Sequence, residues 1–424
     1  MEPPIRLQST DPAQSCFGFS AGVSGDTLVV GSFGKASGDA ANQSGSIQVF
    51  VQIDGAWSQQ ACLKSSQATA EFDWGYVLAI SEGTIAVCSP DGPLEVFSRT
   101  GSVWGHVATF ELPARDGSLP AKTTLAVCGD FIAVGIPNPK VDAPTSALDS
   151  AGSVLIFGRS QGLWEPRATL RAAQPRGNDF FGAGVGLSDN TLAVGAWGDP
   201  CDRAGQVDLH HMVGSGAGYI FTCKEGAWTQ EAYLKADSPR WLCNFGWSAA
   251  ISGNTAVYGC PSESRGAPGC SSKADWGAAY VFTRTGGTWT QTAFLTASDA
   301  EACDHFGLLV AIDGDTIAVA TPDKRNAVTS AISGAAYLFK RNGTTWLQEP
   351  PLHGRTDQLP SGNPPRFGIS VALSGSIMAV GAPTDEPVGS VYVYGINRLN
   401  PASGTHGLKR FDPLKGQPPR AEAD

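Results

Sequence analysis

"FGLLVAIDGDTIAVATPDKRNAVTSAISGAAYLFKRNGTTWLQEPPL", residues 306–352, is the stretch of sequence that decides the fold. Near copies of it recur along the chain, so internal repeats have to be counted before any single element is interpreted. The stretch consists of short β-branched runs separated by Gly, Asn and Asp, and no 3.6-residue apolar period persists anywhere in the chain. This pattern predicts an all-β protein with many tight turns.

Seven copies can be aligned on a Phe-Gly pair or a variant of it. Their first residues are Phe17, Trp74, Ala121, Phe181, Phe245, Phe306 and Phe367. Fourteen residues after each start lies a Gly-Ala-Pro-like corner, at Gly31, Cys88, Gly135, Gly195, Gly259, Ala320 and Gly381. Each copy reads as a small-residue strand, a two-residue turn such as Gly25-Asp26, and three further strands. The repeat therefore predicts a seven-bladed β-propeller of four-stranded antiparallel blades.

The seventh copy ends at its third strand, near Tyr394, and the N-terminus offers the missing fourth. Leu7 lies ten residues before Phe17, close to the spacing found elsewhere. We therefore expect "PIRL" to pair into the last blade and close the ring, which removes two exposed strand edges. The same spacing would place the missing Trp at Met1, so we expect the natural chain to extend upstream. Residues 1–397 are predicted to form the propeller, and the Pro/Gly-rich residues 398–424 a flexible tail or linker.

The Phe-Gly start and the Gly-Ala-Pro corner together resemble the FG-GAP repeat of integrin α-chain propellers, most clearly in "FGISVALSGSIMAVGAP" (residues 367–383). The resemblance covers residues 1–397 and implies extracellular recognition or adhesion. In that family calcium sits in an Asp-rich loop between the first two strands. Here that place holds two-residue turns, and the closest approach, Asp313-Gly314-Asp315, cannot supply six oxygen ligands. The calcium role is therefore not carried over, and we expect no cofactor and no metal site.

Composition restricts the partners and the location. The net charge of −10 and the pI near 5.1 argue against a nucleic-acid partner, which would need a basic surface. No apolar run reaches the roughly 20 residues needed to span a bilayer, so direct membrane insertion is not expected. Ten cysteines without a CxxC pair, and sequons at Asn42 and Asn342, favour an extracellular or surface protein. A bridge between Cys260 and Cys270 could close one loop. Since "MEPPIRLQST" is not a signal peptide, either a leader precedes this sequence or the chain is cytoplasmic.

The connections after the second strand carry most of the length variation. From the corner to the aromatic residue of strand three they range from 9 to 26 residues, while the turns on the other face are short. Because strands alternate in direction, the long connections share one face, as expected for a recognition surface on a rigid frame. Neutral drift in tolerant loops is the alternative. The candidate ligand-binding residues on this face are Trp197, Asp199, Asp202, His210, His211, Trp241, Arg265 and Trp276.

The chemistry of these candidates leaves several interpretations open. Exposed tryptophans could stack on the apolar faces of sugar rings, or they could cover the core under the long loops. Adjacent His210 and His211 with an Asp of the same loop could bind a metal in a suitable loop conformation, but solvated polar side chains are the simpler interpretation. Trp247 is expected to pack inside a first strand. The Phe of each Phe-Gly pair and the Trp of strand four are interpreted as packing between blades.

Enzyme chemistry has little support in the sequence. No Gly-x-Ser-x-Gly elbow, phosphate-binding loop or HExxH is present, and the six histidines are scattered. We therefore assign no catalytic residue, and expect a recognition or adhesion module that binds a protein or glycan through the long loops. Two alternatives remain: a glycan-active propeller enzyme with its site in the central funnel, and a structural subunit of a larger surface assembly.

Overall fold

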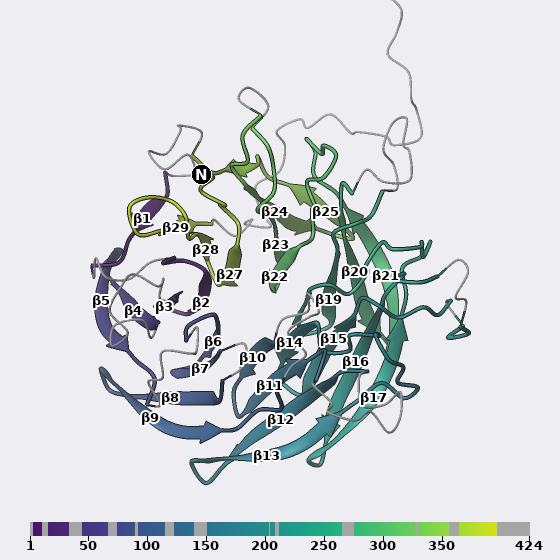
Figure 1. Cartoon of the computed structure of the whole chain (residues 1–424), viewed down its shortest axis with the longest axis horizontal. Helices are drawn as coiled ribbons and strands as arrows, with labels where there is room; N and C mark the ends of the chain where they lie inside the picture. Colours follow the sequence, from purple (N-terminus) through teal and green to yellow (C-terminus); the bar gives the residue numbers. More distant parts are fainter. Residues whose placement is uncertain are drawn as a thin grey trace, which may run out of the picture.

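The structure is a computed structural model that describes residues 3–10, 16–33, 45–66, 74–89, 92–114, 123–139, 151–202, 204–207, 212–264, 275–326, 330–355 and 364–396. All regular elements of these residues are β-strands, arranged in seven antiparallel sheets. The sheets follow one another around a central axis, as Figure 1 shows. The chain is a seven-bladed β-propeller, which confirms the fold predicted from the repeat.

The first three blades have four strands each, in sequential order. Blade 1 contains β2 (Ser20–Ser24), β3 (Thr27–Ser32), β4 (Ser46–Ile53) and β5 (Ala56–Leu63). Blade 2 contains β6 (Val77–Ser81), β7 (Thr84–Cys88), β8 (Leu94–Thr100) and β9 (Val103–Phe110). Blade 3 contains β10 (Thr124–Cys128), β11 (Phe131–Ile136), β12 (Ser153–Ser160) and β13 (Leu163–Leu170).

The next two blades repeat this order. Blade 4 contains β14 (Gly184–Ser188), β15 (Thr191–Ala196), β16 (Ala217–Lys224) and β17 (Ala227–Leu234). Blade 5 contains β18 (Ala249–Ser252), β19 (Thr255–Cys260), β20 (Ala278–Thr285) and β21 (Thr288–Leu295).

The last two blades depart from the simple order. Blade 6 contains β22 (Leu309–Asp313), β23 (Thr316–Thr321), β24 (Ala335–Asn342), β25 (Thr345–Gln348) and β26 (Leu352–His353). Blade 7 contains β27 (Ser370–Ser374), β28 (Ile377–Ala382), β29 (Ser390–Gly395) and β1 (Ile5–Leu7). The predicted single fourth strand of blade 6 is divided into β25 and β26, which both pair with β24. Pro350 and Pro351 lie between them and have no N–H to donate to the ladder.

The N-terminal strand closes the ring, as the spacing predicts. β1 pairs antiparallel with β29, with Ile5 opposite Val393 and Leu7 opposite Val391. The two strands lie side by side in Figure 1. The first and last parts of the described chain are therefore held together in one sheet, and blade 7 acquires its outer strand from the start of the sequence.

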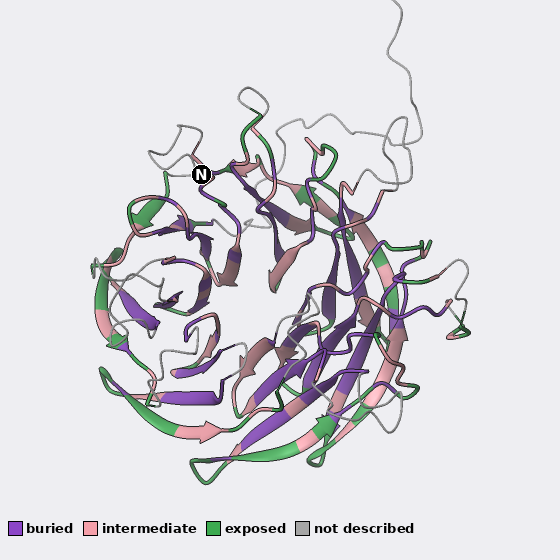
Figure 2. Ribbon diagram, in the orientation of Figure 1, coloured by how far each residue is buried: buried purple, intermediate pink, exposed green. Residues whose placement is uncertain are grey.

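Most of the core lies between blades. The second strands are buried along all or nearly all of their length, since each is covered by a neighbouring blade on both faces. Figure 2 shows this buried interior and the alternating exposure of the outermost strands. Phe245, the first residue of a Phe-Gly pair, is fully buried among Tyr258, Tyr280 and Phe282. Burial of such a ring contributes about 1.5–3 kcal/mol, so packing is sufficient to explain the Phe of this motif.

The two glycines of the repeat have a steric role. Gly246 has φ of +90°, and a Cβ on it would lie 2.4 Å from the carbonyl oxygen of Ala217. Its own carbonyl oxygen would lie 1.9 Å from a Cβ on Gly195, the corner glycine of the preceding blade. The Phe-Gly pair of one blade thus meets the corner of its neighbour backbone against backbone, which only glycine allows at this distance.

Several sequence-based expectations lie outside the described residues, including the tail 398–424, the sequon at Asn42 and Cys270. The second sequon residue, Asn342, ends β24 and is exposed. Among the residues that can be described, no helix is long and apolar enough to cross a bilayer.

Candidate functional site

The long connections gather on one face of the propeller, as strand alternation predicts. The connection 197–216 of blade 4 contacts the start of blade 5, where the amides of Leu242 and Asn244 donate to the carbonyl oxygens of Val213 and Gly214 at 2.8 and 2.9 Å. The connection after β19 makes the equivalent contact with blade 6, where the amide of Phe306 donates to the carbonyl oxygen of Trp276 at 2.9 Å. We call the surface formed by these connections the long-loop face.

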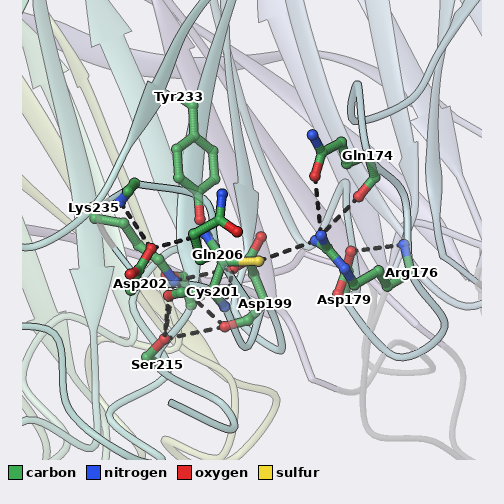
Figure 3. A network of polar contacts seen from close by, with 12 residues as sticks. Gln174, Arg176, Asp179, Asp199, Cys201, Asp202, Gln206, Ser215, Tyr233 and Lys235 are labelled. Carbon is green, nitrogen blue, oxygen red and sulfur yellow. Dashed lines mark hydrogen bonds and ion pairs between the residues drawn. The ribbon is translucent and has the colours of Figure 1, made fainter. Parts of the chain in front are cut away.

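A buried ion pair anchors the connection of blade 4, shown in Figure 3. Asp199 and Lys235 are almost completely buried, and Nζ of Lys235 lies 3.0 Å from Oδ1 of Asp199. The hydroxyls of Tyr219 and Tyr233 donate to the same carboxylate at 3.0 and 3.1 Å. The amide of Cys201 donates to it at 2.8 Å. Two charges that leave water are stabilised only when such additional hydrogen bonds accompany their attraction.

The protonation states follow from this geometry. Burial acts to raise the pKa of Asp199, but the charge of Lys235 and the hydrogen bonds to the carboxylate hold that pKa below its usual value. Burial lowers the pKa of Lys235, and the charge of Asp199 opposes that effect. Lys235 also donates to Oγ of Ser215 at 2.9 Å, so it fixes the far end of the same connection.

The same device recurs around the ring. Four residues after the corner, blades 4–7 each place a buried ionisable side chain: Asp199, Glu263, Lys324 and Asp385. Glu263 accepts from the hydroxyl of Tyr280 at 2.5 Å, and Asp385 from that of Tyr392 at 2.7 Å. Lys324 pairs with Asp304 at 2.9 Å. Buried polar side chains thus attach the ends of the variable connections to the blades.

This arrangement gives Asp199 a structural role that the sequence did not predict. We expected it to contact a ligand, but its side chain lies inside the blade and its oxygens are used by Lys235, two tyrosines and a backbone amide. Asp202 is also used locally, because its Oδ1 accepts from the amides of Ala204 and Gln206 at 2.9 and 2.8 Å. A pocket of about 220 Å³ lies beside the pair, and Asp199, Arg176 and Gln206 are among the residues that line it.

A second buried carboxyl lies beside the pair and makes stability depend on pH. Asp179 accepts from the amide of Arg176 at 2.9 Å, while its Oδ1 is buried with no hydrogen-bond partner. Burial, and next the nearby charge of Asp199, raise the pKa of Asp179 to about 7, against the partial opposition of Arg176 and Lys235. The folded state therefore binds a proton that the unfolded chain releases near pH 4.

Replacing Asp179 by Asn tests this. Since the folded pKa is raised, the contribution of Asp179 to wild-type stability is greatest below about pH 4, falls as pH rises, and is lost above about pH 7. Asp179→Asn should match the wild type near pH 4 and exceed it by about 2–4 kcal/mol at pH 8, measured by urea unfolding at several pH values. The control is Asp189→Asn, at an exposed turn residue, which should leave the pH profile unchanged. If the stability of Asp179→Asn changed with pH in the same way as that of the wild type, the raised pKa of Asp179 would be contradicted.

The central channel opens onto the long-loop face through aromatic side chains. A cavity of about 350 Å³ is lined by the first strands of all seven blades. At its mouth, Phe19, Phe33 and Tyr76 form one cluster, with ring centroids of 4.5–5.7 Å. Trp197 and Trp247 belong to a second, with centroids 5.4 Å apart, and Trp197 stacks on Phe180 at 4.0 Å. Trp247 thus precedes β18 and lines the channel, which corrects the expectation that it packs inside a strand.

The described lining of this channel is apolar and carries no charged side chain. Its serine hydroxyl groups are engaged between blades. Ser20 donates to the carbonyl oxygen of Gly75 at 2.6 Å, Ser248 to that of Gly307 at 3.0 Å, and Ser370 to that of Gly18 at 2.9 Å. The channel therefore offers ring faces and methyl groups, and few hydrogen bonds, to anything that enters it.

An exposed apolar patch lies on the same face, where blades 4 and 5 meet. It consists of Val213, Trp241 and Leu242, whose exposed fractions are 37%, 62% and 46%. The amide of Leu242 bonds to the carbonyl oxygen of Val213, so these residues are neighbours. We call this group the blade 4–5 patch. Exposed apolar residues that cluster in this way mark interaction surfaces more often than single ones do.

The remaining predicted residues are placed as follows. Trp276 is half-buried at the base of the blade 5 connection, and His210, His211 and Arg265 lie outside the described residues. Sequence reasoning missed the aromatic mouth, although a signal existed. Phe19, Tyr76 and Trp247 all stand two residues after the first residue of the repeat, so alignment of the copies places three aromatic rings at one equivalent position.

Comparison with known proteins agrees with this architecture. The sequence model of the FG-GAP repeat matches residues 164–221, 289–339 and 365–394, which cover most of the first three strands of blades 4, 6 and 7. The Phe-Gly pairs of five blades, and Trp74-Gly75 of blade 2, occupy the positions that this repeat requires. The chain is a propeller that carries FG-GAP repeats. A search of curated proteins gave no significant match.

Solved structures resemble the FG-GAP propeller in fold only. One is the crystal structure of the computationally designed Ika8 protein, which is 11% identical, with 90% of this chain and 97% of that chain covered and a TM-score of 0.45. At this similarity the match carries no information about function. What distinguishes this FG-GAP propeller must be sought in its own long-loop face.

Proposed function

We propose that this FG-GAP propeller is a recognition module that binds a protein partner through the long-loop face, with the blade 4–5 patch as its main contact. The exposed cluster of Val213, Trp241 and Leu242 is the observation that carries the proposal. Desolvation of a large aromatic side chain surrounded by apolar neighbours is the usual source of affinity in protein interfaces. The buried anchors beneath the connections support it, because a pre-organised surface loses less entropy on binding.

A protein partner fits the long-loop face better than a glycan does. Tryptophan rings can stack on sugars, but a sugar also needs hydrogen-bond partners for its hydroxyls. The serine hydroxyls of the channel are used between blades. Apolar side chains of a partner, in contrast, need only the ring faces and methyl groups that the channel mouth and the patch provide.

The enzyme alternative receives less support. A hydrolase or lyase in the funnel would need carboxylates or histidines there to transfer protons. Within the described part of the chain, the lining of the channel contains neither. We also place the module outside the cell or at its surface. The FG-GAP repeats and the exposed sequon at Asn342 support this, and neither calcium nor another cofactor is required by the proposal.

The test is a binding screen with the full chain against arrays of cell-surface proteins and of glycans, followed by variants of any ligand found. Trp241→Ser with Leu242→Ser should weaken binding of a protein ligand at least ~30-fold, since truncation of an interface tryptophan commonly costs about 2 kcal/mol or more. Surface plasmon resonance gives the affinity, and thermal unfolding establishes that the variant is folded.

A matched control removes equally exposed apolar side chains elsewhere. Val103 and Leu163, with exposed fractions of 68% and 67%, lie on the outer strands β9 and β13. Val103→Ser with Leu163→Ser should leave the affinity within about threefold of the wild type, as expected for residues outside the contact. Binding to glycans alone, or equal loss in both pairs of variants, would contradict the proposal.

A further inference from the structure

Two thiols and a carboxylate meet inside blade 5. Cys243, Cys260 and Glu263 are each at most 1% exposed. Their sulfur and carboxylate oxygen atoms all lie within 4.8 Å of one another, and no other group of this kind is found in the described part of the chain. The thiol of Cys260 donates to the carbonyl oxygen of Cys243 at 2.9 Å. The thiol of Cys243 donates to the carbonyl oxygen of Ser215, in the blade 4 connection, at 3.3 Å.

The repeat shows what is unusual about this cluster. Cys243 stands two residues before the Phe-Gly pair, Cys260 directly after the corner glycine, and Glu263 four residues after it. The same three positions of blade 6 hold Asp304, Thr321 and Lys324, whose charged pair is 2.9 Å apart. In blade 4 they hold Asp179, Ala196 and Asp199.

Blade 5 thus has two thiols and a carboxylate at the position where the neighbouring blades have charged side chains. Neighbouring blades stabilise this position with an internal pair of opposite charges, from Lys324 in one case and Lys235 in the other. Blade 5 supplies two sulfurs and a carboxylate, which are the ligand types that zinc takes in proteins.

The geometry suits a tetrahedral ion. Zinc–sulfur bonds of about 2.3 Å place the two sulfurs of a tetrahedral site roughly 3.8 Å apart, so the side chains need to close by no more than about 1 Å. Glu263 is oriented by the hydroxyl of Tyr280 at 2.5 Å and by the amide of Ser264 at 2.9 Å. Such outer contacts are typical of metal-binding carboxylates.

We propose that Cys243, Cys260 and Glu263 bind a zinc ion, with a water molecule as the fourth ligand. Both thiols release their protons to solvent when the two zinc–sulfur bonds form. The ion joins two long connections. Cys243 lies between Leu242 and Asn244, which bond to the blade 4 connection, while the carbonyl oxygen of Glu263 accepts from the amide of Gly277 at 2.9 Å and closes the base of the blade 5 connection.

The experiment uses the full chain, reduced with a phosphine and freed of metal with a chelator. Titration with cobalt should produce thiolate-to-cobalt charge transfer and the intense visible bands of a tetrahedral ion, and zinc should displace cobalt with a stoichiometry of one. Zinc should also raise the midpoint of thermal unfolding, because it binds the folded state.

Variants separate this site from adventitious binding. Cys243→Ser and Cys260→Thr should abolish the charge-transfer band, and Tyr280→Phe should weaken zinc ~10–100-fold by loosening Glu263. Cys260→Thr introduces the residue that blade 6 carries at this position, so it should fold. Cys62→Ser with Cys303→Ser removes two exposed thiols and should leave the titration unchanged.

Three results would overturn the proposal. The first is a cobalt spectrum without thiolate character, and the second is unchanged zinc affinity in Cys260→Thr while that variant melts as a folded protein. The third is a Cys243–Cys260 disulfide in the purified chain, detected by mass as the loss of two hydrogens, together with unfolding of the protein when that disulfide is reduced.

Discussion

Replacement of Asp199 by Ala is expected to lower the free energy of unfolding by about 3–5 kcal/mol. The substitution leaves Lys235 buried, with its ammonium group facing the space from which the carboxylate was removed. It also removes the acceptor of the Tyr219 and Tyr233 hydroxyls. Equilibrium unfolding in urea, followed by tryptophan fluorescence, measures the change.

Two comparisons show whether the buried charge is the cause. Asp199→Leu combined with Lys235→Met removes both charges, and should lose less stability than Asp199→Ala alone because no uncompensated charge is left. Asp315→Ala breaks the exposed pair with Arg341, in which the aspartate side chain is 77% exposed, and should change stability by less than about 1 kcal/mol. If the Leu/Met double variant were the least stable of the three, the ion pair itself, and not an unpaired charge, would dominate.

Deletion of residues 1–8 is expected to open the ring. It removes β1 from β29 and takes Arg6 away from Asp385, whose carboxylate is buried and accepts from Nε of Arg6 at 3.1 Å. Loss of one partner from such a buried carboxylate costs about 3–5 kcal/mol, although Arg355 at 3.6 Å offsets part of it. The edge of β29 is then exposed to other chains. Thermal unfolding should shift downward, and gel filtration should show self-association.

A rearranged variant tests whether β1 stabilises the ring by its place in the sheet, wherever it stands in the sequence. A variant that lacks residues 1–8 but carries residues 3–8 after Ile396, joined by a short Gly-containing turn, presents the same strand as a hairpin partner of β29, as β13 is of β12. It should recover most of the lost stability and remain monomeric. If the shortened chain melted at the wild-type temperature without the added strand, ring closure by β1 would contribute little.

The propeller itself could be predicted from the sequence because its determinants are local and repeated. Counterparts of Phe245, Gly246 and Gly259 recur at fixed spacing in most copies, and the described Phe-Gly pairs are buried against a neighbouring blade. The ring closure could also be predicted, since Leu7 keeps the spacing of a fourth strand. Proline interrupts strand four of blade 6 at Pro350, a local effect whose consequence for pairing was not anticipated.

The site could be predicted only in outline. The long-loop face follows from strand direction, but the burial of Asp199 depends on Lys235, which is 36 residues away along the chain. The proximity of Cys243 to Cys260 could not be predicted either, because the two residues stand, along the chain, at opposite ends of the segment that holds blade 5's first two strands. The sequence predicts that Trp247 packs inside a first strand, but its ring lines the channel beside Trp197.

The sequence by itself determined the number of blades, their strand order, the closing strand and the face on which the variable connections lie. These depend on spacing and on backbone hydrogen bonding between neighbouring segments, which a one-dimensional pattern records. Only the tertiary structure decided which side chains in those connections are anchors and which are exposed. The environment of Asp199, Cys243 or Trp241 is set by residues from other strands and other blades, and the free energy of a buried polar group depends on those neighbours.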